Sequence, residues 1–174
     1  MVHSLNEVNA SAPAKIILFG EHFVVYGEPA IVLAINKRAY ASVKMRRDSK
    51  IYINSRDLGI SGYFEKNRFI TEHGGQNAKS TLNPVKTAVQ KVLEKVRKNI
   101  GVDVEIQSSI PVAAGLGSSA AVVAAVTRAT AHLLEVELSD EDIFNITFES
   151  ERLVHGTPSG IDPTVTTYGG VLLF

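Results

Sequence analysis

The sequence predicts an α+β domain in which helices cover one face of a single sheet. Segments with alternating apolar residues, such as residues 102–106, are interspersed with segments whose apolar residues recur at helical spacing, such as residues 85–96. The 174 residues are enough for one domain with its own core. Apolar residues make up 45% of the chain and charged residues 21%, which is typical of a globular protein.

The strands and the first helix are expected in the following order. Short apolar or alternating segments predict strands at residues 14–18, 31–34, 38–46 and 50–54. The glycines and polar residues of the segment 58–80 predict loops there. Asn83 and Pro84 then predict the start of a helix that runs to about residue 98, because Asn caps helices and Pro is tolerated in the first turn. A strand at residues 102–106 follows.

Two further helices are expected in the second half of the chain. Residues 118–134 are apolar almost all round, which is typical of a buried helix. Ser139 with Asp142 predicts a variant capping box for a helix that ends near residue 154. The chain stops in the apolar segment GGVLLF, which suggests the front part of a longer protein, with a genuine terminal strand as the alternative.

Composition excludes several kinds of protein. There is no cysteine, so disulfides and cysteine-ligated zinc are excluded. The 18 basic and 18 acidic residues balance, which argues against a surface that coats nucleic acid. The longest apolar run, residues 120–126, is too short to cross a bilayer, and the first residues lack the pattern of a secretory signal. A cytoplasmic protein without membrane or nucleic-acid partners is therefore expected.

A glycine-rich segment, residues 111–121 (PVAAGLGSSAA), lies between a predicted strand and the buried helix. Gly115 and Gly117 lack side chains, so backbone N–H groups can converge on an anion, and the helix dipole favours the same ligand. Ser118 and Ser119 add hydroxyls that can cap the helix or bind a metal or phosphate. The segment is neither a Walker A loop nor a dinucleotide fingerprint. The alternative is that these glycines and serines only begin a helix and bind no phosphate.

Lys15 interrupts the apolar strand at residues 14–18. A lysine in a short buried strand is costly unless it meets a counter-charge or an anionic ligand; the alternative is an edge position with the amine in water. Glu21 and His22 follow Gly20 at the exit of this strand, where functional groups often collect. The alternative for His22 is a structural histidine.

Two acidic residues complete the set of candidates. Glu151 lies near the packed face of its predicted helix, where its carboxylate is either at the rim or aimed into a site. Asp162 follows the turn at Ser159 and Gly160. Each acid alone is consistent with a solvated or capping residue. Together with Lys15 and the glycine-rich segment, they provide an anion cradle, a metal ligand, a base and a cation, which are the groups that phosphoryl transfer needs.

Three segments together resemble the GHMP kinase family: residues 13–27 (PAKIILFGEHFVVYG), 111–121 and 151–162 (ERLVHGTPSGID). They occur in the family's order and span essentially the whole chain. Within the family, GEHFVVYG resembles the branch that phosphorylates mevalonate, whereas galactokinases usually carry an Asp-Tyr pair soon after Glu-His. Asp162 also distinguishes the chain from kinases that act on the 3-hydroxyl of mevalonate.

The resemblance implies a role for each matching residue. Asp162 corresponds to the catalytic base and Lys15 to a catalytic lysine that contacts it, the hydroxyl or the phosphoryl group. Ser119 and Glu151 correspond to Mg²⁺ ligands, with Ser118 as the alternative to Ser119. The expected ATP contacts are Ser108, Ala114, Gly115, Leu116, Gly117, Ser118 and Ser119. The residues expected near mevalonate are Lys15, Glu21, His22 and Asp162.

The resemblance also implies an architecture and a reaction. Residues 1–174 correspond to the ATP-binding N-terminal domain, a two-layer sheet-and-helix fold with a βαβ crossover like that of a ribosomal protein. The family's C-terminal lobe is not in this chain, and we expect that lobe to complete the site. The implied reaction is ATP- and Mg²⁺-dependent phosphorylation of mevalonate at its 5-hydroxyl. Whether the protein forms a homodimer is left open.

Three alternatives remain at this point. One is another small-molecule kinase of the family, acting on homoserine or phosphomevalonate. Another is a non-catalytic nucleotide- or RNA-binding module, against which Glu151 and Asp162 count because carboxylates repel phosphate unless a metal intervenes. The last is an inactive fragment that only binds nucleotide.

Overall fold

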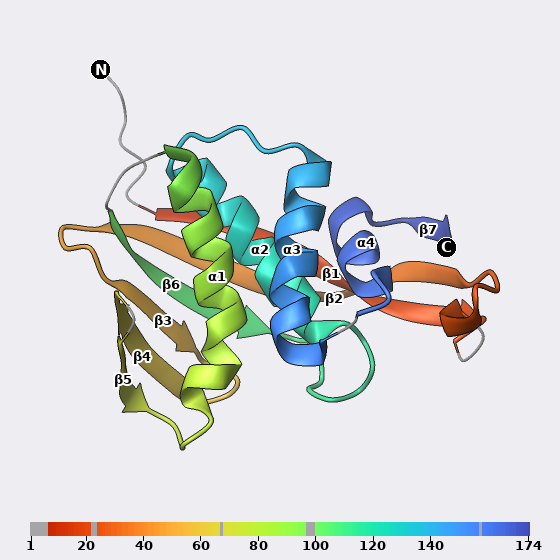
Figure 1. Cartoon of the computed structure of the whole chain (residues 1–174), viewed down its shortest axis with the longest axis horizontal. Coiled ribbons are helices and arrows are strands. Elements are labelled where there is room, and N and C mark those ends of the chain that lie inside the picture. The colour runs from red at the N-terminus through yellow and green to blue at the C-terminus, as the bar shows by residue number, and fades with distance from the viewer. Residues whose placement is uncertain (1–6, 22–23, 67, 97–99, 157) are drawn as a thin grey trace.

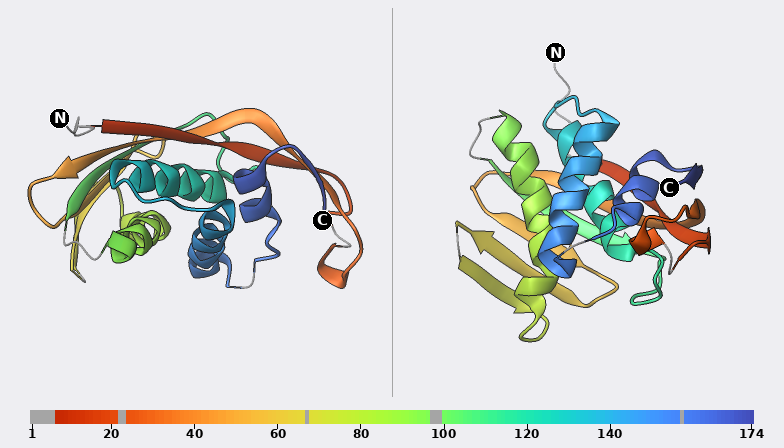
Figure 2. Two further views of the ribbon diagram at one scale, coloured as in Figure 1. Left: turned by 90° about the horizontal axis from the view of Figure 1, so that it is seen from above. Right: turned by 45° about the vertical axis from the view of Figure 1, so that its right-hand side comes forward.

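The computed structural model describes residues 7–21, 24–66, 68–96, 100–156 and 158–174. In these ranges the chain forms two layers, a sheet and a set of helices that cover one of its faces (Figures 1 and 2). This confirms the predicted α+β class. The elements in chain order are β1 (Glu7–Phe19), the 3-10 turn η1 (Val24–Tyr26), β2 (Ile31–Arg46), β3 (Ile51–Ser55), β4 (Ile60–Glu65), β5 (Arg68–His73), α1 (Ala78–Val96), β6 (Gly101–Ser108), α2 (Ser118–Leu133), α3 (Asp140–His155), α4 (Ile161–Tyr168) and β7 (Val171–Leu173).

The strand order in the sheet is β1-β2-β6-β3-β4-β5, and β7 pairs with the start of β2. β3 and β6 are parallel, whereas the other strand pairs in the described ranges are antiparallel. The chain passes from β3 to β6 through β4, β5 and α1, which forms the βαβ crossover. β1 and β2 are long and extend past β6, β3, β4 and β5 at one end, where β7 pairs with β2 (Figure 2).

The core lies between the sheet and the helices. Val43, Ile53 and Val104 point from the sheet toward Val89 of α1 and Val126 of α2, and all five side chains are almost completely buried. α2 contacts β1 and β2 as well as α1, α3 and α4. A helix covered on so many sides must be apolar almost all round, as its sequence predicts. In the described part of the chain, no helix has the length and apolar character needed to cross a membrane.

The loop prediction for residues 58–80 is wrong, because this segment contains the hairpin β4–β5 and the first turn of α1. Gly62 does not break the hairpin. A Cβ built there would lie 2.6 Å from the ring of Phe69, so the glycine allows that ring to cross the strand closely. The Phe69 ring packs in turn on Phe64, with the ring centroids 4.6 Å apart. Burial of these rings favours strands despite the surrounding polar residues.

The predicted start of the first long helix is also wrong. α1 begins at Ala78, and Pro84 lies inside it. The side chains of Ala78 and Leu82 are buried in the first turns, and this burial outweighs the backbone hydrogen bond that Pro84 cannot donate. By contrast, the capping box predicted from Ser139 and Asp142 is confirmed, because each accepts a hydrogen bond from the backbone N–H of the other.

Candidate active site

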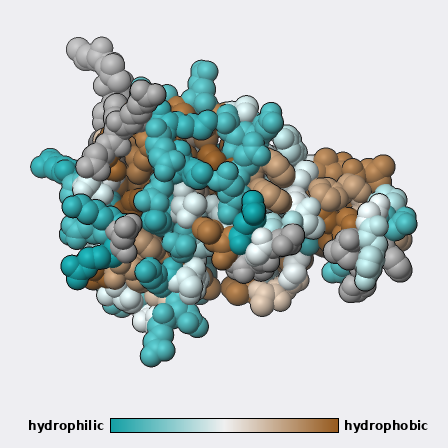
Figure 3. All heavy atoms as spheres, in the orientation of Figure 1, coloured by the Kyte–Doolittle hydropathy of each residue, from teal (hydrophilic) through white to brown (hydrophobic). Residues whose placement is uncertain are grey.

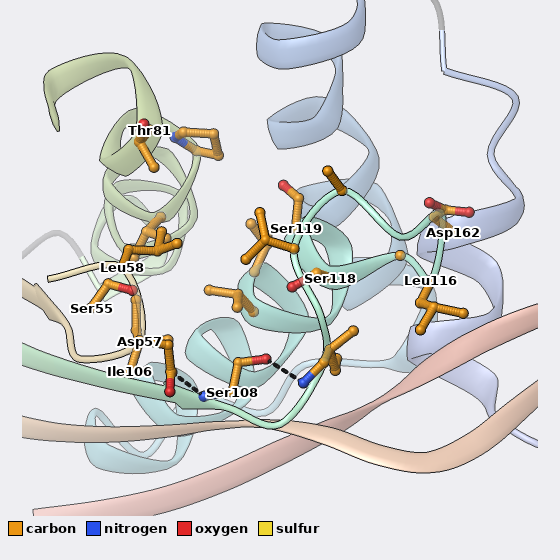
Figure 4. A pocket seen from close by; sticks show the side chains of 18 of the residues that line it. Ser55, Asp57, Leu58, Thr81, Ile106, Ser108, Leu116, Ser118, Ser119 and Asp162 are labelled. Atoms are coloured by element: carbon orange, nitrogen blue, oxygen red, sulfur yellow. Dashed lines mark hydrogen bonds between the residues drawn. The ribbon is translucent and has the colours of Figure 1, made fainter. Parts of the chain in front are cut away.

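A cavity of about 640 Å³ lies where α1, the β3–β4 turn, the β6–α2 loop and the first turns of α2 and α4 meet (Figure 4). Ser55, Asp57, Leu58 and Thr81 lie at one end, and Asp162 lies at the other. The side chains of Ser108, Ser118 and Ser119 lie between these ends, and that of Leu116 lies at the end of Asp162. The cavity therefore joins residues from both halves of the chain.

The β6–α2 loop forms one wall of this cavity, and its backbone is unusual. Ala113, Gly115 and Gly117 have φ angles of 58°, 69° and 70°, in the left-handed region. Gly117 is the N-cap of α2, and no side chain caps the first N–H groups of that helix. Uncapped N–H groups at the positive end of a helix dipole form an anion-binding site. The loop residues Ala114 to Ser119 all line the cavity, as expected for phosphate contacts.

Lys15 and Asp162 form an ion pair beside this loop. The Nζ of Lys15 lies 3.1 Å from Oδ1 of Asp162, and the side chains are 9% and 32% exposed, respectively. The alternative that placed the Lys15 amine in water is therefore wrong. The backbone N–H of Lys15 also donates to the carbonyl of Leu116 at 3.0 Å, which attaches β1 to the glycine-rich loop.

Gly117 provides the space that this ion pair occupies. A Cβ built on Gly117 would lie 3.1 Å from Cγ of Lys15 and 3.4 Å from Oδ2 of Asp162. Asp162 is in the first turn of α4, where the helix dipole favours a carboxylate. The sequence predicted a turn before Asp162 but missed α4, for which Gly160 as N-cap and Pro163 in the first turn were available signals.

Glu151 and the two serines lie on the same cavity. Glu151, on α3, is only 3% exposed and lines the cavity, so of its two predicted positions the structure has the one directed into a site. Ser118 and Ser119 are the first residues of α2. Within the described ranges, no three His, Cys, Asp or Glu side chains gather as a metal cluster. Glu151 with Ser118 or Ser119 suits Mg²⁺, which binds through one or two carboxylates together with phosphate oxygens and water.

The other end of the cavity contains a residue that sequence reasoning missed. The carboxylate of Asp57 accepts a hydrogen bond from the backbone N–H of Ser108 (Figure 4). The hydroxyl of Ser108 in turn accepts from the N–H of Ile110 at 3.1 Å. Asp57 precedes Leu58 and Gly59 in a turn, and an acidic residue in a turn is too common to single out. Only the pairing of β3 with β6 places it beside Ser108.

Of the two candidates after β1, Glu21 is not among the residues that line the cavity. Glu21 is exposed in the turn that follows β1. His22 lies outside the described residues. The structure therefore brings together Lys15, Ser108, the loop, Glu151 and Asp162, but does not bring Glu21 to them.

Known proteins of one family are similar to this chain. Residues 83–170 match the GHMP kinases N terminal domain. The mevalonate kinase of Pyrococcus furiosus is 46% identical over 172 residues, which is 97% of this chain and 52% of that protein. That of Archaeoglobus fulgidus is 40% identical over 166 residues, which is 95% of this chain and 52% of that protein.

Solved structures show the same likeness. The Methanococcus jannaschii mevalonate kinase superposes with a TM-score of 0.79 at 27% identity, covering 97% of this chain and 53% of that one. The L. major mevalonate kinase in complex with R-mevalonate superposes with a TM-score of 0.72 at 28% identity, covering 95% of this chain and 48% of that one. The chain thus spans about half the length of the relatives it matches. By its motifs, its fold and the match over residues 83–170, the chain belongs to the GHMP kinase family.

Proposed function

We propose that residues 1–174 form the ATP-binding domain of a kinase that transfers the γ-phosphoryl group of ATP to the 5-hydroxyl of mevalonate. The Lys15–Asp162 ion pair at the uncapped N-terminus of α2 is the observation that carries this proposal. It places a carboxylate and a cation beside backbone donors that suit phosphate. The substrate is proposed because archaeal relatives at 40–47% identity are mevalonate kinases, each matched over about half its length.

In this proposal ATP lies along the cavity. Its phosphates contact the N–H groups of the loop from Ala114 to Ser119, and its nucleoside lies toward Ser108, Leu58 and Thr81. The volume of about 640 Å³ falls within the usual range for small-molecule sites. The loop's donors are fixed before the reaction, so they can stabilise the charge that develops on the transferred group.

The transfer itself uses Asp162 and Lys15. The mevalonate 5-hydroxyl oxygen forms a bond to the γ-phosphorus, the bond from that phosphorus to the bridging oxygen of ADP breaks, and the hydroxyl proton moves to Asp162. The Lys15 ammonium, 3.1 Å from Asp162, holds the carboxylate in place and adds positive charge beside the phosphoryl group.

Mg²⁺ would be held by Glu151 and by the hydroxyl of Ser119, with Ser118 as the alternative. A bound Mg²⁺ would neutralise charge on the β- and γ-phosphates. Both hydroxyls and the Glu151 carboxylate belong to residues that line the cavity beside the loop, which supports this assignment.

Mevalonate would lie near Lys15 and Asp162, and the family resemblance adds Glu21 and His22 as its further contacts. The relatives contain about as much chain again as is matched here. We propose that a domain like their second half packs on the exposed apolar end of the β1–β2 hairpin and completes the substrate site. More than half of the side chain is exposed at Leu18 and Phe19 of β1, at Tyr26 of η1, and at Val171 and Leu173 of β7, which pairs with β2. Figure 3 shows apolar residues gathered at one end of the molecule.

The experiment is to follow ADP release from Mg-ATP with and without mevalonate. It is run on the chain alone and on the chain fused to the second half of the Pyrococcus furiosus relative. Mevalonate-dependent release in either form supports the proposal. Release that depends instead on homoserine or phosphomevalonate would replace the substrate. Failure of the fused form to release ADP with any of the three acceptors would refute the kinase assignment.

A further inference from the structure

A second cavity, of about 540 Å³, lies on the other side of the first turns of α1, between that helix and the end of β4. Its lining residues are Phe64, Lys66, Gln76, Lys79, Ser80, Asn83 and Lys86. It shares only Ser80 with the cavity of the candidate active site. The second cavity is therefore separate from the first, and the two cavities lie on opposite sides of α1.

The polar side chains that line this cavity are either positively charged or neutral. Three of its residues are lysines, and none is acidic. Lys79 and Lys86 are seven positions apart on α1, which places them on one face about 10 Å apart along the helix axis. Lys66 lies in the turn after β4, and Phe64, which is buried, also lines the cavity. A lysine side chain is long enough for such groups to converge on one ligand.

These three lysines differ from the lysines further along the same helix. Lys91 pairs with Glu149 at 2.7 Å and Lys95 pairs with Asp142 at 2.8 Å. Among the ion pairs of the described residues, none includes Lys66, Lys79 or Lys86. The three lysines therefore give this cavity a positive charge that no side chain lining it balances, although the chain as a whole has no formal net charge.

We propose that this cavity binds an anion that carries two linked phosphate groups. Three ammonium groups offer several donors without an acceptor, and the amides of Gln76 and Asn83 add further N–H groups. Lysine acts as a point charge toward phosphate, so three lysines suit a compact ligand of several negative charges better than a single carboxylate. The separation of Lys79 from Lys86 favours a ligand longer than one phosphate.

The test is a titration of the ¹⁵N-labelled chain with inorganic diphosphate, followed residue by residue in amide spectra. We expect saturable shifts at Lys66, Lys79, Asn83 and Lys86. The shifts at Gly115 and Gly117 form a separate curve that reports on the candidate active site. The two proposals can therefore fail independently, because each has its own set of signals. Affinity at the lysine cavity should decrease as salt increases.

Variants decide whether the lysines are responsible. The double substitution K79Q/K86Q should weaken diphosphate binding at this cavity at least tenfold and leave the shifts at Gly115 and Gly117 unchanged. K66Q, which changes a different element, should weaken the same curve. K91Q is the matched control on α1, and it should leave that curve unchanged.

Three outcomes would overturn the proposal. The first is an absence of shifts at the lysine cavity while those at Gly115 and Gly117 saturate. The second is equal affinity for inorganic phosphate and diphosphate, which would exclude a ligand with two linked groups. The third is a single-stranded RNA oligonucleotide that binds the same residues more tightly than diphosphate, which would make the site a nucleic-acid surface.

Discussion

The ammonium group of Lys15 and the carboxylate of Asp162 lie 3.1 Å apart, although they belong to the first strand and the last helix. They meet because α2 and α4 both pack on β1, and Gly117 at the start of α2 leaves room between them. This relationship brings the chemical groups of three separate sequence motifs together beside one cavity.

Asp162→Asn should remove the proposed base and retain the shape of the side chain. We expect mevalonate-dependent ADP release to decrease by about 10²–10⁴-fold, the usual contribution of a general base. Nucleotide affinity, measured by calorimetry, should stay within about twofold, since the loop supplies the phosphate contacts. Asp140→Asn, in the first turn of α3 and away from the cavity, is the control and should retain full activity. Near-normal turnover in the Asp162 variant would show that another group accepts the proton.

Gly117→Ala should lower both stability and activity. The alanine methyl would lie 3.1 Å from Lys15 and would occupy a residue whose φ is 70°. Gly115→Ala has nearly the same φ, 69°, but its methyl would meet nothing within 4 Å. Both variants should lose about 1–2 kcal/mol of stability in denaturant unfolding, the cost of a left-handed residue. Only the Gly117 variant should also displace the ion pair, so an equal loss of activity in the two would contradict this packing.

Glu151→Gln should weaken the response to Mg²⁺. The side chain is nearly isosteric, so the fold should tolerate it, but an amide is a weaker ligand for a hard cation than a carboxylate. A Mg²⁺ titration of ADP release should shift to at least tenfold higher concentration. Glu149→Gln, two residues away and paired with Lys91 on the surface, is the control. Superimposable Mg²⁺ curves for the Glu151 variant and the parent chain would remove Glu151 from the metal site.

Acid stability should depend in part on Asp142. Hydrogen bonds from Lys95 and from the backbone and hydroxyl of Ser139 hold the pKa of this carboxyl below its usual value. Its contribution to stability is therefore complete above the unfolded pKa of about 3.9, and is lost as the pH falls through the lower folded pKa.

The corresponding measurement is urea unfolding of Asp142→Ala across pH. Because the pair is largely exposed, we expect a loss of only about 0.5–1 kcal/mol at pH 7, which should disappear at low pH. Glu141→Ala in the same turn is the control. A difference that does not change with pH would show that Asp142 acts through helix propensity and not through its charge.

About half of the residues that line the cavity belong to motifs that residue type and order reveal. The glycine-rich loop, Glu151, Lys15 and Asp162 are recognisable in this way, because phosphate and metal chemistry restricts which residues can occur there. The hairpin β4–β5 and the start of α1 are not predictable from local sequence. Their residues favour turns, and only contacts made across the folded hairpin, such as that of the Phe69 ring with Gly62, favour strands.

Residue type and spacing alone determine the α+β class, the buried character of α2 and the capping box of α3, since each depends on residues close together in the chain. The family resemblance allowed a contact between Lys15 and Asp162, and the tertiary structure decides that they form an ion pair. Only the tertiary structure decides that Asp57 accepts a hydrogen bond from Ser108 and that three lysines surround a second cavity. These contacts join elements that are remote in sequence. Their geometry is set by the packing of the helices on the sheet, which no local pattern encodes.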